Sequence, residues 1–163
     1  MEINVGDPIM HWTYGLSRVV GMEERALAGP AMLYYAVEVS HLTIWVPADD
    51  NLHNRLRRPT TKSGFKRLFA ILASPGEPLP EDRQERRTHV LGLLKDGRAE
   101  SLCRVIRDMV AHKLTTNLNE SDQALLKRAE GVLLGEWSYS FSIPETQAEA
   151  DMFHLLKAEP VAG

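Results

Sequence analysis

The chain has 163 residues, of which 44% are hydrophobic and 25% are charged, and its formal net charge is −3. This composition is typical of a globular protein with one ordinary domain or two small ones. No apolar run approaches the roughly 18 residues of a membrane-spanning helix, and the first residues lack the layout of a signal peptide. Cys103 is the single cysteine, which excludes an intramolecular disulfide and a cysteine-based metal site. We therefore expect a cytoplasmic protein without a membrane contact.

The first 57 residues of the chain have the pattern of a small β-barrel. Runs of β-branched and aromatic residues are separated by Gly, Pro or Asp, which is typical of strands joined by turns. We expect four strands, at residues 9–13, 16–25, 32–40 and 42–47. The aromatic residues Trp12, Tyr14 and Tyr35 are expected in the barrel core rather than in a ligand cage.

From Pro59 onward the apolar residues recur with a period of about 3.6 instead of 2, which marks the start of a helical domain. Ser63 is placed to cap a first helix that ends before Pro75-Gly76, and further helices are expected at about 81–96 and 99–114. Asn119 opens a fourth helix, and Pro144 begins a fifth that runs through Leu156. The predicted fold class is α+β, with a barrel over residues 1–58 and a bundle of about five helices over residues 59–163.

The sequence lacks the local motifs of the common enzyme and cofactor sites. It contains no G-x-x-x-x-G-K-[ST] loop, no G-x-G-x-x-G after a strand and no H-E-x-x-H. Its six histidines are scattered, without the i, i+3 or i+4 pairing that a helical metal site needs. We expect neither catalysis, nor a cofactor, nor a metal, and nothing in the sequence demands more than a monomer.

Charge is distributed unevenly along the chain. Residues 1–53 hold two basic and seven acidic residues, residues 54–104 hold twelve and six, and residues 105–163 hold five and nine, so the three blocks carry −5, +6 and −4. A basic block between two acidic ones is a candidate nucleic-acid footprint. Solvated helices are also rich in charge, so this pattern alone leaves both interpretations open.

The basic block includes one candidate DNA-binding segment, near the start of the second helix. Arg83, Arg86 and Arg87 stand at i, i+3 and i+4, so we expect their three guanidinium groups to project from one side of the helix. The free amides of a helix start already favour anions, and phosphate groups could be held there. The alternative is that the acidic neighbours Glu81, Asp82 and Glu85 simply pair with these arginines.

The order of these parts resembles the CarD/CdnL family of bacterial transcription regulators. In the first half, the resemblance is carried by Val5-Gly6-Asp7, Tyr14-Gly15, Arg18-Val19-Val20-Gly21, Tyr34–Val39 and Thr43–Pro47. In the second half, it is carried by Leu93–Gly97, Val105–Met109, Leu118–Asp122 and Leu126–Ala129, so it covers about residues 3–140. It implies a Tudor-like module that docks on the RNA polymerase β subunit. It also implies a helical domain that contacts promoter DNA at the upstream edge of the transcription bubble and modulates open-complex stability.

The resemblance places the polymerase-binding residues at Arg25, Thr43, Ile44 and Trp45. Arg25 matches a basic position of the family, whereas Trp45 stands where relatives usually carry a basic residue. Strict alternation puts Ile44 and Val46 on one face of their strand and Trp45 on the other, and the sequence leaves open which face is buried. In the family, docking extends a sheet of the polymerase through main-chain hydrogen bonds, a binding mode that tolerates such changes.

The resemblance assigns DNA contact to Arg83, Arg86 and Arg87, with one departure. Arg83 aligns with a tryptophan that in the family contacts the opened duplex, and an arginine cannot reproduce an apolar insertion between bases. We therefore expect weaker stabilisation of melted DNA, with contacts to the backbone or minor groove and no base-specific readout. The alternative function is a protein-interaction adaptor on the same barrel that has lost its DNA role.

Overall fold

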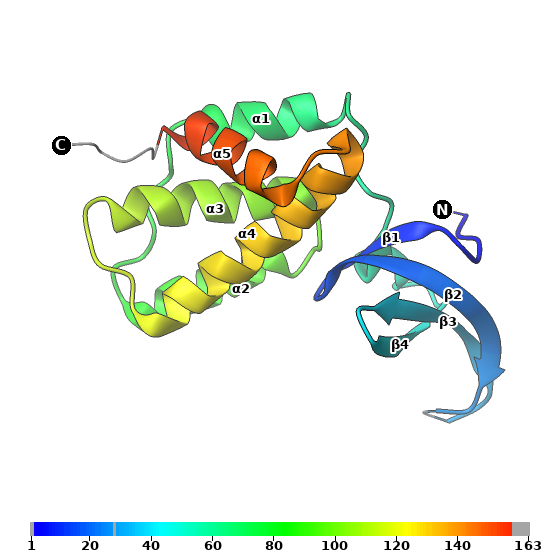
Figure 1. Cartoon of the computed structure of the whole chain (residues 1–163). Helices are drawn as coiled ribbons and strands as arrows, with labels where there is room; N and C mark the ends of the chain where they lie inside the picture. The colour runs from blue at the N-terminus through cyan, green and yellow to red at the C-terminus, as the bar shows by residue number, and fades with distance from the viewer. Residues whose placement is uncertain (1, 28, 158–163) are drawn as a thin grey trace. The chain divides into compact units, whose positions relative to one another are not determined.

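The computed structural model describes residues 2–27 and 29–157 (Figure 1). The chain divides into two compact units, Met1–Pro59 and Thr60–Gly163. In the part of the chain that is described, no helix is both long and apolar enough to cross a membrane.

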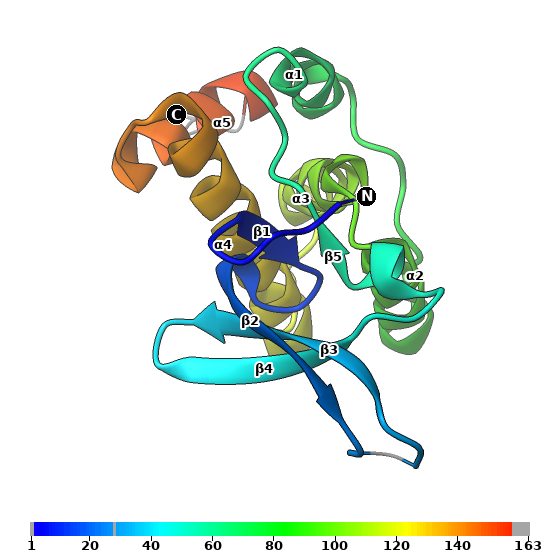
Figure 2. The same ribbon diagram turned by 90° about the vertical axis from the view of Figure 1, so that its right-hand side faces the viewer.

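The N-terminal unit is a curled antiparallel sheet of five strands (Figures 1 and 2). The strands are β1 (Pro8–His11), β2 (Gly15–Arg25), β3 (Met32–Val39), β4 (Leu42–Pro47) and β5 (Leu56–Arg57), and their order across the sheet is β4-β3-β2-β1-β5. The four predicted strands are confirmed to within two residues at each end. The strand β5 was not predicted, because it is two residues long and follows a polar, turn-rich segment.

One face of this sheet carries a small apolar core. Its buried members are Ile3, Ile9, Val19, Val37, Val46 and Leu56. Residues that pair directly across antiparallel strands share a face, so the pairs Val37↔Ile44 and Tyr35↔Val46 place four side chains on the core side. Tyr35 packs against this core, as expected.

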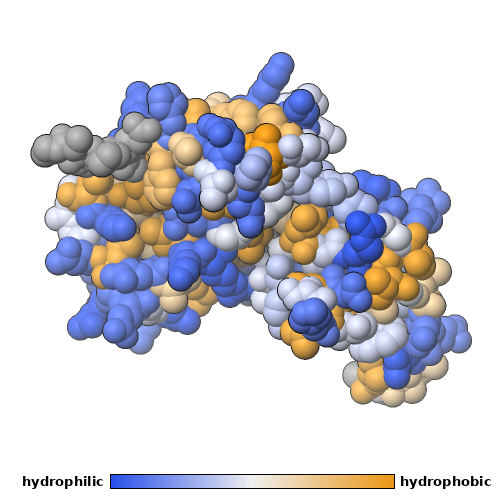
Figure 3. Space-filling model, in the orientation of Figure 1, coloured by the Kyte–Doolittle hydropathy of each residue, from blue (hydrophilic) through white to orange (hydrophobic). Residues whose placement is uncertain are grey.

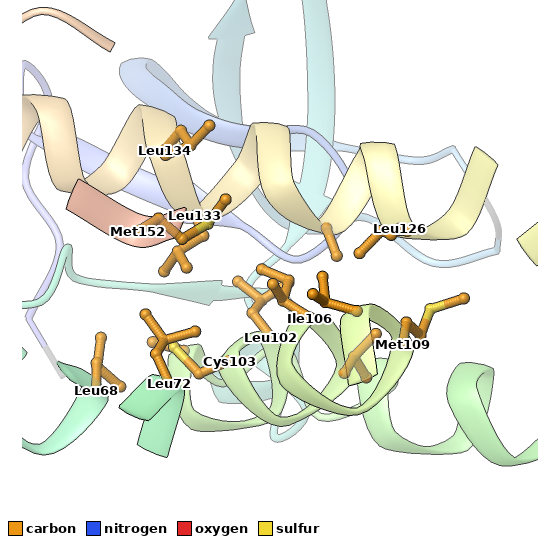
Figure 4. Close-up of a cluster of buried hydrophobic side chains, with 14 of the residues drawn as sticks. Leu68, Leu72, Leu102, Cys103, Ile106, Met109, Leu126, Leu133, Leu134 and Met152 are labelled. Atoms are coloured by element: carbon orange, nitrogen blue, oxygen red, sulfur yellow. The ribbon is translucent and has the colours of Figure 1, made fainter. Parts of the chain in front are cut away.

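The C-terminal unit is helical, and together the two units confirm the predicted α+β class. Its five described helices are α1 (Phe65–Ala73), α2 (Arg83–Leu94), α3 (Ala99–Lys113), α4 (Glu120–Phe141) and α5 (Glu145–Leu156). The core lies between α3, α4, α1 and α5, where Leu102, Ile106 and Met109 face Leu126, Leu133 and Met152 (Figure 4). Cys103 is buried among them, which confirms its interpretation as a small core residue.

Two of the helix starts differ from the sequence expectation. The residue before α1 is Gly64, and its amide donates to the Thr61 hydroxyl over 3.1 Å, so Ser63 does not cap this helix. Pro144 directly precedes α5 instead of forming its first residue, because its ψ of 150° is extended. The α4 start is as expected, since Asn119 and Asp122 form a reciprocal capping box.

The beginning of the helical unit is fixed by the C-terminal half of α4. The amide of Thr60 donates to the fully buried carboxylate of Glu136 over 2.7 Å, and the Thr60 carbonyl accepts from the Ser140 hydroxyl over 2.6 Å. Both main-chain groups of one residue are thereby satisfied by side chains one helical turn apart.

The segment between α1 and α2 is held against α3 in a similar way. The buried carboxylate of Asp108 accepts from the Glu77 amide over 2.8 Å and from Arg107 Nε over 2.9 Å. Gly76 packs so closely on α3 that a Cβ atom there would lie 2.6 Å from the Cβ of Ala111 and 3.3 Å from the Arg107 carbonyl oxygen. A side chain at position 76 would therefore push this segment off α3.

We expect Gly76→Ala to lower the free energy of unfolding by about 1–3 kcal/mol, the usual range for inserting a methyl group into a packed site. Urea unfolding of the full chain, followed by circular dichroism, measures this change. Gly92→Ala is the matched control, because Gly92 lies in α2 with open space around it. That change should stabilise by about 0.5–1 kcal/mol through helix propensity. Equal effects of the two substitutions would contradict the assigned packing of Gly76.

Candidate nucleic-acid and polymerase interfaces

Arg86 is buried, with 4% of its surface exposed. Its Nε and Nη2 donate to one carboxylate oxygen of Asp122 over 3.1 and 2.7 Å, and its Nη1 donates to the carbonyls of Pro80 and Glu81 over 3.2 and 3.0 Å. The expectation that all three guanidinium groups project to one side is therefore wrong for Arg86. It shares the inward face of α2 with Val90, four residues later, whereas Arg83 and Arg87 form a stripe of their own.

Asp122 also belongs to the capping box of α4. Its carboxylate accepts from the Asn119 amide over 3.2 Å, and its own amide donates to the Asn119 side chain over 2.8 Å. One carboxylate thus closes the first turn of α4 and binds the first turn of α2. The Arg86–Asp122 ion pair therefore fixes the starts of the two helices relative to each other.

The environment of this pair keeps both groups charged. The hydrogen bond to Asp122, followed by its negative charge, raises the pKa of Arg86 against the opposing effect of burial. Burial alone would raise the pKa of Asp122. The hydrogen bonds from Arg86 and from the Asn119 amide, with the charge of Arg86, outweigh burial and lower that pKa. A buried ion pair persists only with such additional hydrogen bonds, because desolvation costs several kcal/mol per ion.

Arg83 and Arg87 are exposed and lie one turn apart on α2. Nη1 of Arg87 donates to the hydroxyl of Ser121 in the first turn of α4. Within residues 2–27 and 29–157, neither arginine forms an ion pair with an acidic residue, so the predicted alternative of pairing with Glu81, Asp82 and Glu85 is not what the structure has. Figure 3 shows hydrophilic side chains gathered over this part of the helical unit. We call Arg83 and Arg87 the α2 arginine pair.

In the N-terminal unit, the structure brings Arg25 and Trp45 together. The Arg25 guanidinium carbon lies 4.2 Å from the centroid of the Trp45 ring, a cation–π contact, and Nη1 of Arg25 is 3.5 Å from the Glu23 carboxylate. Trp45 pairs with Ala36 across the strands, on the face opposite the core. The orientation that the sequence left open is therefore settled, with Trp45 pointing outward.

The remaining two candidate residues of the polymerase-binding face differ in their surroundings. Thr43 is exposed and shares the outward face of β4 with Trp45. Ile44 packs against the apolar core, so its side chain is not part of the outward surface. β4 lies at one end of the sheet, and its outer main-chain groups have no strand partner among the described residues.

Two aromatic residues lie where the sequence did not place them. Trp12 and Tyr14 are 47% and 49% exposed, so the expectation that they fill the barrel core is wrong. β1 ends at His11, and alternation no longer applies in the turn that follows. The buried His11 organises this turn, because its Nδ1 accepts from the amides of Thr13 and Tyr14 over 3.0 and 3.3 Å. Burial lowers the pKa of His11, which favours the neutral ring that this acceptor role requires.

No group of three His, Cys, Asp or Glu side chains that could hold a metal ion occurs in the part of the chain that the structure describes. The candidate interfaces described above, which are the α2 arginine pair, the Arg25–Trp45 pair and the free edge of β4, are suited to macromolecular contacts.

We expect Asp122→Asn and Arg86→Met each to destabilise the chain by about 3–5 kcal/mol, because each leaves an unpaired buried charge. The double variant removes both charges and keeps an amide for the cap, so it should be more stable than the sum of the two changes. Urea unfolding of the unmodified chain, the two single variants and the double variant measures the coupling free energy. Additive effects of the two substitutions would contradict the ion pair.

The stabilisation from this ion pair should also depend on pH. Folding lowers the pKa of Asp122, so the stabilisation is present above the unfolded pKa of about 3.9 and is lost as the pH falls through the folded value.

The comparisons with known proteins agree with this arrangement. A family model described as CarD, C-terminal domain, matches residues 67–153, from α1 into α5. The putative transcription factor YdeB of Bacillus subtilis (strain 168) is 22% identical over 148 residues, which cover 90% of this chain and 97% of that relative. The match spans both units, and the family match covers more than half of the chain. The chain therefore belongs to the CarD family of transcription regulators.

Proposed function

We propose that this protein is a non-enzymatic transcription regulator that docks on the β subunit of bacterial RNA polymerase and contacts promoter DNA at the upstream edge of the transcription bubble. There it modulates the stability of the open complex. The observation that carries the proposal is the exposed α2 arginine pair, held where the first turns of α2 and α4 meet by the buried Arg86–Asp122 ion pair, in a chain of the CarD family.

Docking is proposed for the outward face and free edge of β4. An edge strand offers main-chain donors and acceptors that can extend a sheet of the partner. Beside that edge, the Arg25 guanidinium stacks on Trp45, and both residue types are among those that most often dominate binding energy at interfaces. Thr43 lies on the same face, and Ile44 contributes its main chain only.

DNA contact is proposed for Arg83 and Arg87, with Arg86 as the residue that positions them. Two exposed guanidinium groups can bind phosphate oxygens or enter a narrow minor groove, and they do not make a base-reading surface. Two phosphate contacts are few for a free DNA-binding protein. A tether to the polymerase compensates, because it raises the effective concentration of the helical unit beside the promoter.

We expect Arg25→Glu to weaken binding of the full chain to the isolated polymerase β lobe by at least about tenfold, because it places a carboxylate against the ring and reverses the charge of the docking face. Isothermal titration calorimetry measures the affinity. Arg25→Lys, which keeps a cation beside Trp45, is the matched control and should retain most of the affinity. Undiminished binding by Arg25→Glu would exclude this face as the docking site.

We expect Arg83→Ala/Arg87→Ala to weaken binding of the full chain to duplex DNA of arbitrary sequence. Each lost phosphate contact should reduce the slope of log affinity against log salt by about 0.9. Fluorescence anisotropy at a series of NaCl concentrations measures both effects, and Gln84→Ala, an exposed neighbour on α2, is the control.

The same substitutions separate the proposal from a protein-interaction adaptor without a DNA role. If Arg83→Ala/Arg87→Ala retains the full effect on promoter opening, the adaptor is the correct reading, and the burial of Arg86 already leaves that site with fewer cations than the sequence suggested. Arg83→Trp, which restores the aromatic residue of the family, should lengthen the open-complex lifetime.

A further inference from the structure

A second cationic surface lies on the helical unit, between α1 and the start of α3. Arg67 of α1 and Arg98, the residue that directly precedes α3, both reach the same carboxylate oxygen of Glu100, with Nη···Oε2 distances of 3.4 and 3.5 Å. Arg104 is exposed and lies four residues after Glu100, on the same face of α3. We call Arg67, Arg98 and Arg104 the α1/α3 arginine cluster.

The cluster keeps most of its hydrogen-bonding capacity free. The side chains of Arg67 and Arg98 are 73% and 64% exposed, and each guanidinium carries five N–H donors, of which the contact with Glu100 uses one. Arg67 and Arg98 both contact Glu100, and the carboxylate of Asp96 accepts from the Arg98 amide. Three arginines against these two carboxylates leave a net positive charge. Burial opposes ionisation of Glu100, but a backbone hydrogen bond and the charges of Arg98 and Arg67 lower its pKa. The carboxylate therefore stays charged and orients two guanidinium groups toward solvent.

This surface accounts for the part of the basic block that the α2 arginine pair leaves unexplained. Residues 54–104 hold twelve basic residues, and only two of them form that pair. Arg98 lies four residues beyond the C-terminal end of α2, whose 12 residues span about 18 Å at 1.5 Å per residue. Arg98 therefore lies near the end of α2 that is opposite the α2 arginine pair, and the length of this helix corresponds to about five base-pair steps of roughly 3.4 Å.

We propose that the α1/α3 arginine cluster is a second phosphate-binding surface for the backbone of double-stranded DNA. This inference rests on the proposed function, in which the helical unit contacts the promoter. Arginine suits the role because its planar fork binds phosphate oxygens in pairs. Contacts of this kind position a protein on the duplex and carry no sequence information. Glu100 acts as the internal counter-ion that the phosphates replace.

The test compares the full chain with Arg67→Ala/Arg98→Ala and with Glu100→Gln in anisotropy titrations of a 30-base-pair duplex (about 100 Å long) at several NaCl concentrations. The alanine variant should bind more weakly, with a salt slope reduced by about 1.8. Glu100→Gln removes the competing carboxylate and keeps both arginines, so it should bind more tightly. Folding is not at issue, because exposed ion pairs contribute only about 0–1 kcal/mol.

Parallel titrations of Arg83→Ala/Arg87→Ala separate this inference from the proposed function. If that variant loses affinity and Arg67→Ala/Arg98→Ala does not, the cluster is not a DNA surface and the proposed function stands. If only the cluster variant loses affinity, the cluster is the DNA surface and the assignment of the α2 arginine pair is wrong. No duplex binding by the unmodified chain would overturn both. Retained DNA affinity with lost polymerase binding would assign the cluster to an acidic protein surface instead.

Discussion

The arrangement of the helical unit depends on the buried ion pair between Arg86 and Asp122. Removing two charges from water is costly, and apolar residues of similar volume often stabilise a fold as well or better. The contribution of the pair here is to position two helices relative to each other. Asp122 is already committed to the cap of α4, so its bond to Arg86 fixes the first turn of α2 against the first turn of α4. With the two helix starts held together, Arg87 donates a hydrogen bond to Ser121, and Arg83 lies exposed one turn earlier on α2.

In the N-terminal unit, the candidate docking surface depends on which side chains of β4 face away from the core. Alternation along β4 sends Ile44 and Val46 to the core and Thr43 and Trp45 to the outside. Trp45 is half-buried on the outer face of this edge strand, and the guanidinium of Arg25 covers part of its ring. The result is a rigid, amphipathic surface beside free main-chain groups. In the proposed function, this surface holds the helical unit near DNA, so a small set of exposed arginines is sufficient.

Much of this structure could be predicted from local patterns. Alternation located the long strands, and the change of period at Pro59 located the helical unit, because both patterns reflect the burial of one face. The helix start at Asn119 could also be predicted, because the two partners of its capping box, Asn119 and Asp122, are only three residues apart in the sequence. The fate of Arg86 was not predictable, because its partner lies 36 residues away and a stripe of arginines looks alike whether buried or exposed. Trp12 was misplaced because the predicted strand 9–13 was extended beyond His11 into a turn, and Tyr14 lies in the same turn, where alternation does not predict burial.

The most direct test of the account is an NMR titration of the ¹⁵N-labelled full chain with a short DNA duplex, observing backbone amides and arginine Nε–H groups together. The account predicts that the Arg86 Nε–H is visible and protected from exchange before DNA is added, and that it stays so afterwards. The largest shifts on addition of DNA should occur at Arg83, Arg87 and Ser121. An Arg86 Nε–H that exchanges freely with water, or shifts that leave the starts of α2 and α4 unchanged, would contradict it.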